Sequence, residues 1–133
     1  MKRVFILALA ALLAGALPVG AQADARITWP PPVYDVAGTV AVLGTVSSPD
    51  LQAYFLEVAR YDQENPQWIP ASLPATQPVT DGVLAEWITT LVPDGIYRLR
   101  LRAQLRTGAV LTDEVGPLRV ANALERPAGE APA

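Results

Sequence analysis

The sequence of 133 residues contains no His and no Cys, and these two absences remove most catalytic sites from consideration. The chain cannot build a Ser-His-Asp triad, a Cys-His dyad or a His-ligated zinc site. It also cannot form a disulfide, so the core alone must hold the fold together. Paired carboxylates remain, but a small domain offers little room for a glycosidase cleft. We therefore predict a protein that is not an enzyme and uses no cofactor or metal.

Lysine is nearly absent as well, because Lys2 is the only one in the chain. Lys2 and Arg3 precede an apolar run from Phe5 to Leu17, and small residues follow at 21–23, which is the pattern of a signal peptide over 1–23. The run is shorter than the ~20 apolar residues that span a bilayer. We predict cleavage after Ala23 and a secreted, periplasmic or cell-surface protein, with an uncleaved anchor as the alternative.

The remaining chain is acidic. Eight arginines face thirteen acidic residues after residue 23, a net charge of about −5, which makes nucleic acid an improbable partner. About 110 residues suffice for one domain that buries roughly two-thirds of its unfolded surface. Four oxygen-bearing residues at 62–65 lack the spacing of a known calcium loop, so we interpret them as a solvated turn.

Short segments of alternating hydrophobicity recur at intervals of roughly ten residues, which is typical of β-sandwiches and barrels. We predict an all-β antiparallel sandwich of about seven strands over 24–121, followed by a disordered tail at 122–133. The proline-rich segment 62–78 is predicted to cross between sheets without pairing, with Trp68 and Ile69 against the edge of the core. The predicted strands are Arg26–Trp29, Thr39–Val46, Leu51–Tyr61, Val83–Thr90, Tyr97–Leu105 and Val110–Val120.

The segment from Tyr97 to Leu105 has the clearest pattern. Its odd-numbered residues are apolar, and its even-numbered ones are Arg98, Arg100, Arg102 and Gln104, so one face should be buried and the other solvated. On the preceding strand we expect Val83 and Ala85 to share a face with Trp87, with Trp87 at the centre of the core.

The motif Leu91-x-Pro93-x-x-x-Tyr97 resembles the corner before the penultimate strand of fibronectin type III and immunoglobulin-like sandwiches. The segments GTVAVLGT, YFLEV, DGVL and DGIYRLRL are similar to small Ig-like modules of bacterial secreted proteins. The resemblance implies an Ig-like or fibronectin type III-like fold, in which the Tyr hydroxyl bonds to upstream backbone. It also implies a spacer, adhesion or binding role.

The candidate site is the outer face of two strands that should pair in such a sandwich. Arginines and aromatic side chains would lie together there, and both are enriched at interfaces. We predict that this face binds an anionic cell-envelope polymer or an acidic protein partner. The predicted site residues are Phe55, Tyr61, Trp68, Arg98, Arg100 and Arg102.

Three alternatives remain open. In the first, the arginines only stabilise a solvated face, with Glu57 as counter-ion. In the second, the chain is a carbohydrate-binding module that uses Trp68, Phe55 and Tyr61 as a stacking platform. In the third, it is a structural or adhesion subunit that joins its neighbours through an open sheet edge. The sequence does not decide the oligomeric state.

Overall fold

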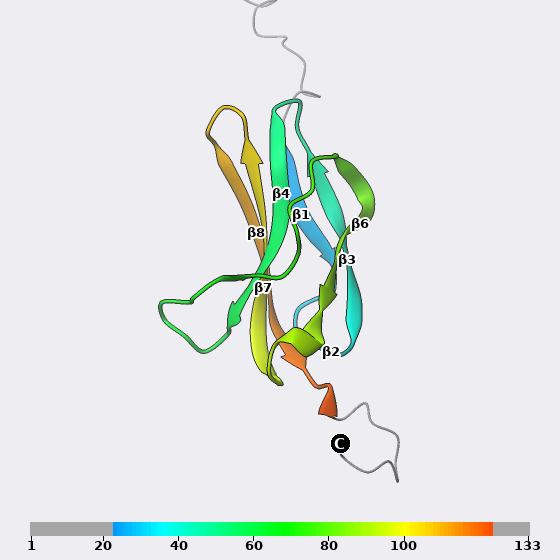
Figure 1. The fold of residues 1–133 in the computed structure, drawn as a ribbon, viewed down its shortest axis with the longest axis vertical. Coiled ribbons are helices and arrows are strands. Elements are labelled where there is room, and N and C mark those ends of the chain that lie inside the picture. Colours follow the sequence, from blue (N-terminus) through cyan, green and yellow to red (C-terminus); the bar gives the residue numbers. More distant parts are fainter. Residues whose placement is uncertain (1–22, 124–133) are drawn as a thin grey trace, which may run out of the picture.

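A computed structural model describes residues 23–123. It is all-β, with two sheets packed face to face and one short 3₁₀ helix, η1 (Figure 1). The elements are β1 (Asp24–Trp29), β2 (Tyr34–Val36), β3 (Thr39–Ser47), β4 (Leu51–Arg60), β5 (Ile69–Pro70), β6 (Val79–Ile88), η1 (Thr89–Leu91), β7 (Gly95–Leu105) and β8 (Val110–Val120). The predicted all-β fold class is therefore confirmed, and two very short strands, β2 and β5, join those that the sequence indicated.

The two sheets differ in width. The first has the order β1-β3-β6 and the second the order β2-β8-β7-β4-β5. Between the layers, β1 contacts β8 and β7, and β6 contacts β4. All pairs are antiparallel except β2 with β8, which is parallel. At one side of the molecule, β5 therefore extends beyond the last strand of the narrower sheet.

The core lies between the sheets and follows the alternation of the strands. Along β7 the predicted inward residues are all buried, from Tyr97 to Leu105, while the arginines between them remain partly exposed. Trp87 is 1% exposed and is the largest fully buried side chain, so its predicted place in the core is confirmed. The other core members include Val42, Val46, Tyr54, Leu56, Val58, Leu84, Leu118 and Val120.

The prediction for the first half of β6 was wrong. Val83 is 53% exposed, and Leu84 is buried in its place. The pairing partner of Val42 is Ala85 and that of Leu43 is Val83, so Leu84 is an extra residue that bulges into the core. A bulge reverses which residues face inward, and simple alternation cannot anticipate it.

The proline-rich segment was also misjudged in part. It contains β5, which pairs with Glu57 and Val58 of β4. Farther along, Tyr54 and Ala75 exchange backbone hydrogen bonds of 2.8 and 2.9 Å. Ile69 is 46% exposed rather than tucked against the core. The segment is thus a short, irregular edge of the wider sheet.

Close backbone approach explains one glycine. A Cβ on Gly44 would collide with the carbonyl oxygen of Arg26 on the neighbouring strand β1. Only a residue without a side chain lets β1 and β3 approach this closely.

The folded domain extends beyond Ala121 at its C-terminal end, as far as Ala123. The backbone N–H groups of Asn122 and Ala123 donate to the carboxylate of Asp94, at 3.1 and 3.0 Å. The Asn122 side chain accepts from the Gly38 N–H at 2.7 Å. These two residues, which the sequence analysis placed in the tail, belong to the folded domain. The rest of the tail and the signal-peptide segment lie outside the described residues.

Candidate binding surfaces

The outer face of the wider sheet brings together most of the predicted site residues. Across the β4–β7 pair, Phe55 lies opposite Arg102 and Glu57 opposite Arg100. On the other side of β7, Arg100 lies opposite Glu114 and Arg102 opposite Thr112. We call this surface the arginine face. The predicted pairing of the two strands is confirmed, and so is the outward direction of the three arginines.

Arg100 lies at the centre of the arginine face and contacts both Glu57 and Trp68. Its Nε and Nη2 atoms donate to Glu57 Oε1 at 2.9 and 2.7 Å. Its guanidinium carbon lies 4.1 Å from the centroid of the Trp68 ring, which is cation–π geometry. The Glu57 and Arg100 side chains are only 12% and 17% exposed. Trp68 therefore covers an ion pair on the outer face instead of packing against the edge of the core.

Arg98 is held in a similar way, at the other end of the face. Its guanidinium lies 5.3 Å from the Tyr61 ring centroid and donates to the Tyr61 carbonyl at 3.0 Å. Its Nη1 atom is 3.9 Å from Glu114 Oε1. Arg102 differs from both, because it forms no ion pair in the described part of the chain. Its buried Nε, like that of Arg98, has no hydrogen-bond partner.

These contacts limit what the arginine face can bind. Tyr61 and Trp68 each hold a guanidinium over one ring, so they are not open stacking platforms of the kind that binds sugar rings. Two of the three arginines have a carboxylate partner within the chain. Of these three arginines, Arg102 is the one without an ion pair among residues 23–123, and it lies opposite the half-buried Phe55.

A further ion pair between an arginine and a carboxylate links β8 to β2. Arg119 of β8 donates through Nε and Nη2 to both carboxylate oxygens of Asp35. These hydrogen bonds and the charge of Arg119 lower the pKa of the Asp35 carboxyl below its ordinary value, and raise that of Arg119. Both side chains are at least half exposed, so the pair should contribute little to the stability of the fold.

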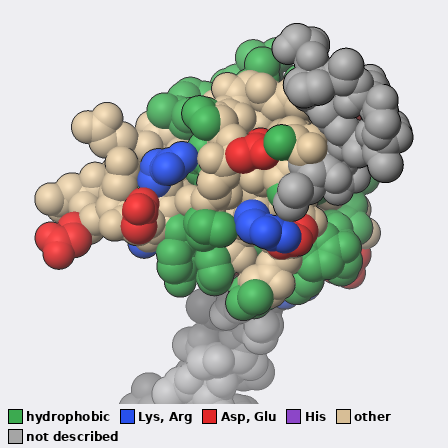
Figure 2. Space-filling model, turned by 90° about the horizontal axis from the view of Figure 1, so that it is seen from below, with side chains coloured by type: hydrophobic (Ala, Val, Ile, Leu, Met, Phe, Trp, Pro, Cys, Tyr) green, Lys and Arg blue, Asp and Glu red, His purple; other side chains and the backbone are tan. Residues whose placement is uncertain are grey.

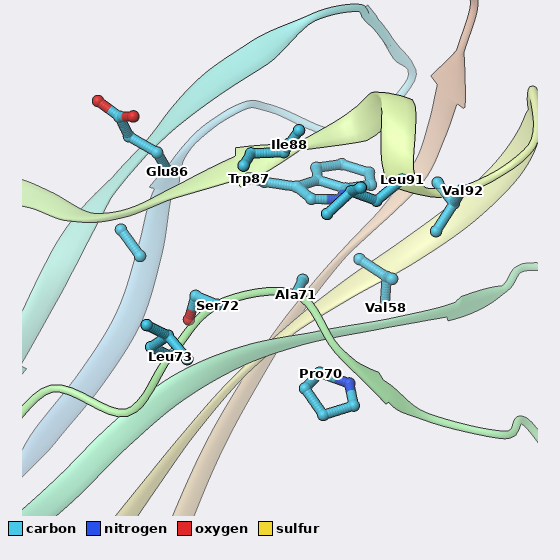
Figure 3. A pocket seen from close by; sticks show the side chains of 11 residues that line it. Val58, Pro70, Ala71, Ser72, Leu73, Glu86, Trp87, Ile88, Leu91 and Val92 are labelled. Atoms are coloured by element: carbon cyan, nitrogen blue, oxygen red, sulfur yellow. The ribbon is translucent and has the colours of Figure 1, made fainter.

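The sequence did not reveal a hollow that lies at the open side of the sandwich, between β6 and the segment after β5. Figure 3 shows Trp87 and Leu91 on one side of it and Ala71 and Leu73 on the other. Trp87 and Val58 are buried and form its floor, whereas Leu91 is exposed at its rim. The hollow encloses about 540 Å³ and is lined mainly by apolar side chains. We call it the edge groove. Its residues come from three separate parts of the sequence, Val58, 70–73 and 85–92, so no local motif signals it.

The rim of the edge groove is unusually apolar for a solvent-facing surface. Leu73 is 87% exposed and Leu91 is 79% exposed, and Ile88 is also exposed beside them. Seen from the end of the molecule at which η1 lies, hydrophobic side chains form several patches, with pairs of acidic and basic side chains between them (Figure 2). Clustered exposed apolar side chains mark sites of interaction more often than single ones do.

Among residues 23–123 there is no group of His, Cys, Asp or Glu side chains that is arranged to hold a metal ion. In that same part of the chain, no helix is long and apolar enough to cross a membrane. Comparison with protein-family models, curated protein sequences and solved structures finds no match for this chain.

Proposed function

We propose that this chain is an exported, non-enzymatic module of the immunoglobulin-like or fibronectin type III-like type, and that it binds a protein partner at the cell envelope. The observation that carries the proposal is the edge groove, an apolar hollow of about 540 Å³ with exposed leucines at its rim. Exposed apolar surface of this kind marks sites of protein interaction more often than scattered apolar residues do.

Two observations favour the Ig-like part of the proposal. The Tyr97 hydroxyl donates to the Pro93 carbonyl at 2.6 Å, which is the upstream bond that the resemblance implies at this corner. The strands also form two packed sheets of three and five. The export part rests on the N-terminal sequence pattern alone.

The arginine face is the second candidate, and Arg102 is the observation that favours it. A guanidinium without a counter-ion, next to an aromatic ring, suits a phosphate or carboxylate group of an envelope polymer. Because its two neighbours already have carboxylate partners, we rank this role below binding at the edge groove. The carbohydrate-binding alternative ranks lower still, since two of its three aromatic rings, Tyr61 and Trp68, each hold an arginine guanidinium.

Co-sedimentation tests these roles against one another. The purified full chain is mixed with isolated bacterial cell envelopes, with protease-treated envelopes and with a neutral insoluble polysaccharide, at low and high salt. A groove variant, Leu73→Ser with Leu91→Ser, is compared with a face variant, Arg98→Ser, Arg100→Ser and Arg102→Ser. Both variants must first be shown to unfold cooperatively.

We expect the wild type to pellet with untreated envelopes, to stay soluble after protease treatment, and to lose binding in the groove variant. Binding that disappears at high salt and in the face variant would instead assign the function to an anionic polymer. Salt-resistant binding to the polysaccharide would make the chain a carbohydrate-binding module. If no mixture pellets, the proposed envelope function is wrong.

A further inference from the structure

The unequal width of the two sheets leaves one strand uncovered. Because β6 lies over β4, the segment from β5 to Ala75 has no strand of the narrower sheet above it. The edge groove is the space that such a strand would occupy. In Figure 3 the groove is bounded by β6 on one side and by residues 70–73 on the other.

The β6 edge beside the groove is suited to pairing. Its first half is irregular, because Asp81 has a φ of 47° and the pairing with β3 shifts at two places. From Ala85 to Ile88 the register is unbroken, with Thr39 opposite Ile88 and Val42 opposite Ala85. No described strand pairs with the other side of β6. The stretch therefore offers free backbone donors and acceptors in regular strand geometry.

The second half of β6 carries little protection against pairing. Proteins shield edge strands with Pro, with charged side chains, especially Lys, or with bulges. The opposite wall of the groove carries Pro70, and the first half of β6 carries bulges. The residues Ala85, Glu86, Trp87 and Ile88 include neither Pro nor Lys, and their one charged side chain is Glu86. A stretch whose one protecting charge is negative, next to an apolar hollow, suits a partner strand of opposite charge.

The side chains of this stretch specify the chemistry of an incoming strand. Trp87 points toward the groove and Glu86 points away from it, onto the outer surface of the sheet (Figure 3). Glu86 is exposed and forms no ion pair within the described part of the chain. A strand added here would place apolar side chains over Trp87 and a side chain beside Glu86 on the outer face.

We propose that the edge groove receives an extended segment of a partner protein, which adds to β6 along Ala85–Ile88. The segment has apolar side chains at alternate positions and a basic residue on its outer side, opposite Glu86. This inference rests on the proposed function and specifies its partner. Main-chain pairing supplies general affinity in such strand addition, and the side-chain pockets supply selectivity.

A second copy of the chain fits this edge less well. If β6 paired with β6 of another copy, the two Glu86 carboxylates would share one face of the joined sheet. Like charges near one another on a sheet are destabilising. The chain after residue 23 also carries more acidic than basic residues. The charge of the edge thus favours a basic partner strand over self-association.

The probe is a labelled heptapeptide of sequence SVKVKLT, whose alternate positions carry the apolar side chains. SVEVELT reverses its charge, and SVKPKLT blocks strand pairing because proline lacks an N–H. Binding to the full chain is measured by fluorescence anisotropy. Amide hydrogen exchange is followed at residues 85–88 and, for comparison, along β1. Glu86→Lys is compared with Glu64→Lys, which makes the same charge change in an exposed loop.

We expect SVKVKLT to bind, SVEVELT to bind about tenfold more weakly and SVKPKLT not to bind. Glu86→Lys should reverse the preference between the two charged peptides, whereas Glu64→Lys should leave it unchanged. Exchange should slow at residues 85–88 and stay the same along β1.

Three outcomes overturn the inference. Equal binding of all three peptides would mean that the groove takes up apolar groups without pairing. Self-association that protects residues 85–88 and excludes the peptide would make a second copy the occupant. No peptide binding, with retained binding to envelopes, would refute strand addition and leave the proposed function standing. Peptide binding without binding to envelopes would support the strand site and refute the envelope function.

Discussion

The arginine face and the edge groove differ in how completely their side chains are satisfied within the chain. On the arginine face, Arg100 has Glu57 and Trp68, and Arg98 has Tyr61. At the edge groove, Leu73 and Leu91 project into solvent beside a strand without a second neighbour. Two of the three arginines on the first surface have partners within the chain, whereas the second surface leaves exposed leucines beside an edge of β6 that no other described strand pairs with.

The difference teaches that residue type alone does not mark an interface. Arginines and aromatics are enriched at interfaces, yet here they engage one another across a sheet. The floor of the edge groove consists of ordinary core residues. The groove exists because the narrower sheet ends at β6, so that no described strand covers the segment after β5. A search for sites must therefore ask which groups remain unsatisfied after folding.

Removing the floor of the edge groove should have the largest effect. Trp87→Ala deletes a side chain that is 1% exposed and contacts the core, so the free energy of unfolding should fall by about 3–5 kcal/mol. Urea unfolding followed by circular dichroism measures the change. Trp29→Ala is the matched control and should cost much less, because Trp29 is 40% exposed. Equal losses would mean that the groove floor is not part of the core.

Breaking the central ion pair tests whether the arginine face is a stabilising surface. Glu57→Ala leaves the partly buried Arg100 guanidinium without its carboxylate, which should cost about 2 kcal/mol. A double-mutant cycle with Arg100→Ala isolates the pair, and we expect a coupling energy of about 1 kcal/mol or more. Strict additivity of the two changes would show that the contacts contribute nothing, and would free Arg100 for a ligand.

The groove rim should behave in the opposite way. Leu91→Ser changes an exposed side chain, so stability should shift by no more than about 0.5 kcal/mol. The fluorescence of the dye ANS, which reports accessible apolar surface, should nevertheless fall, since the rim borders the apolar hollow. Val110→Ser, at an exposed valine far from the groove, serves as control. A fall in stability without loss of dye signal would reverse the assignment.

Much of the fold was predictable, because alternation is a local property. The pattern from Tyr97 to Leu105 gave the correct faces, and the bounds of β8 coincide with the predicted Val110–Val120. Pairing of β4 with β7, and with it the proximity of Phe55 and Arg102, followed from the expected sandwich. The exposed fractions of the side chains on this face could not be predicted from the alternation. Glu57 is buried because Trp68, from a distant loop, covers its partner Arg100.

The edge groove was not predictable for the same physical reason. The bulge at Leu84 depends on how β6 meets β3, and the hollow depends on how far β5 extends beyond β6. Both are consequences of packing between segments that are distant in sequence. The motif from Leu91 to Tyr97 contained the rim residue Leu91, but its sequence gave no sign that this leucine would remain exposed.

The smallest effect belongs to the outermost pair of the wider sheet. Because Arg119 lowers the pKa of Asp35 in the folded state, the pair stabilises the fold above the ordinary pKa of Asp, near 3.9. That contribution is lost as the pH falls through the lower pKa of the folded state. In an NMR titration, Asp35 should titrate at a lower pH in the wild type than in Arg119→Gln, whereas Arg106→Gln should leave it unchanged. Equal midpoints would mean that this exposed pair separates in solution. Ion pairs on the outer surface of the sheet would then persist in solution only where Trp68 and Tyr61 shield the arginines from water.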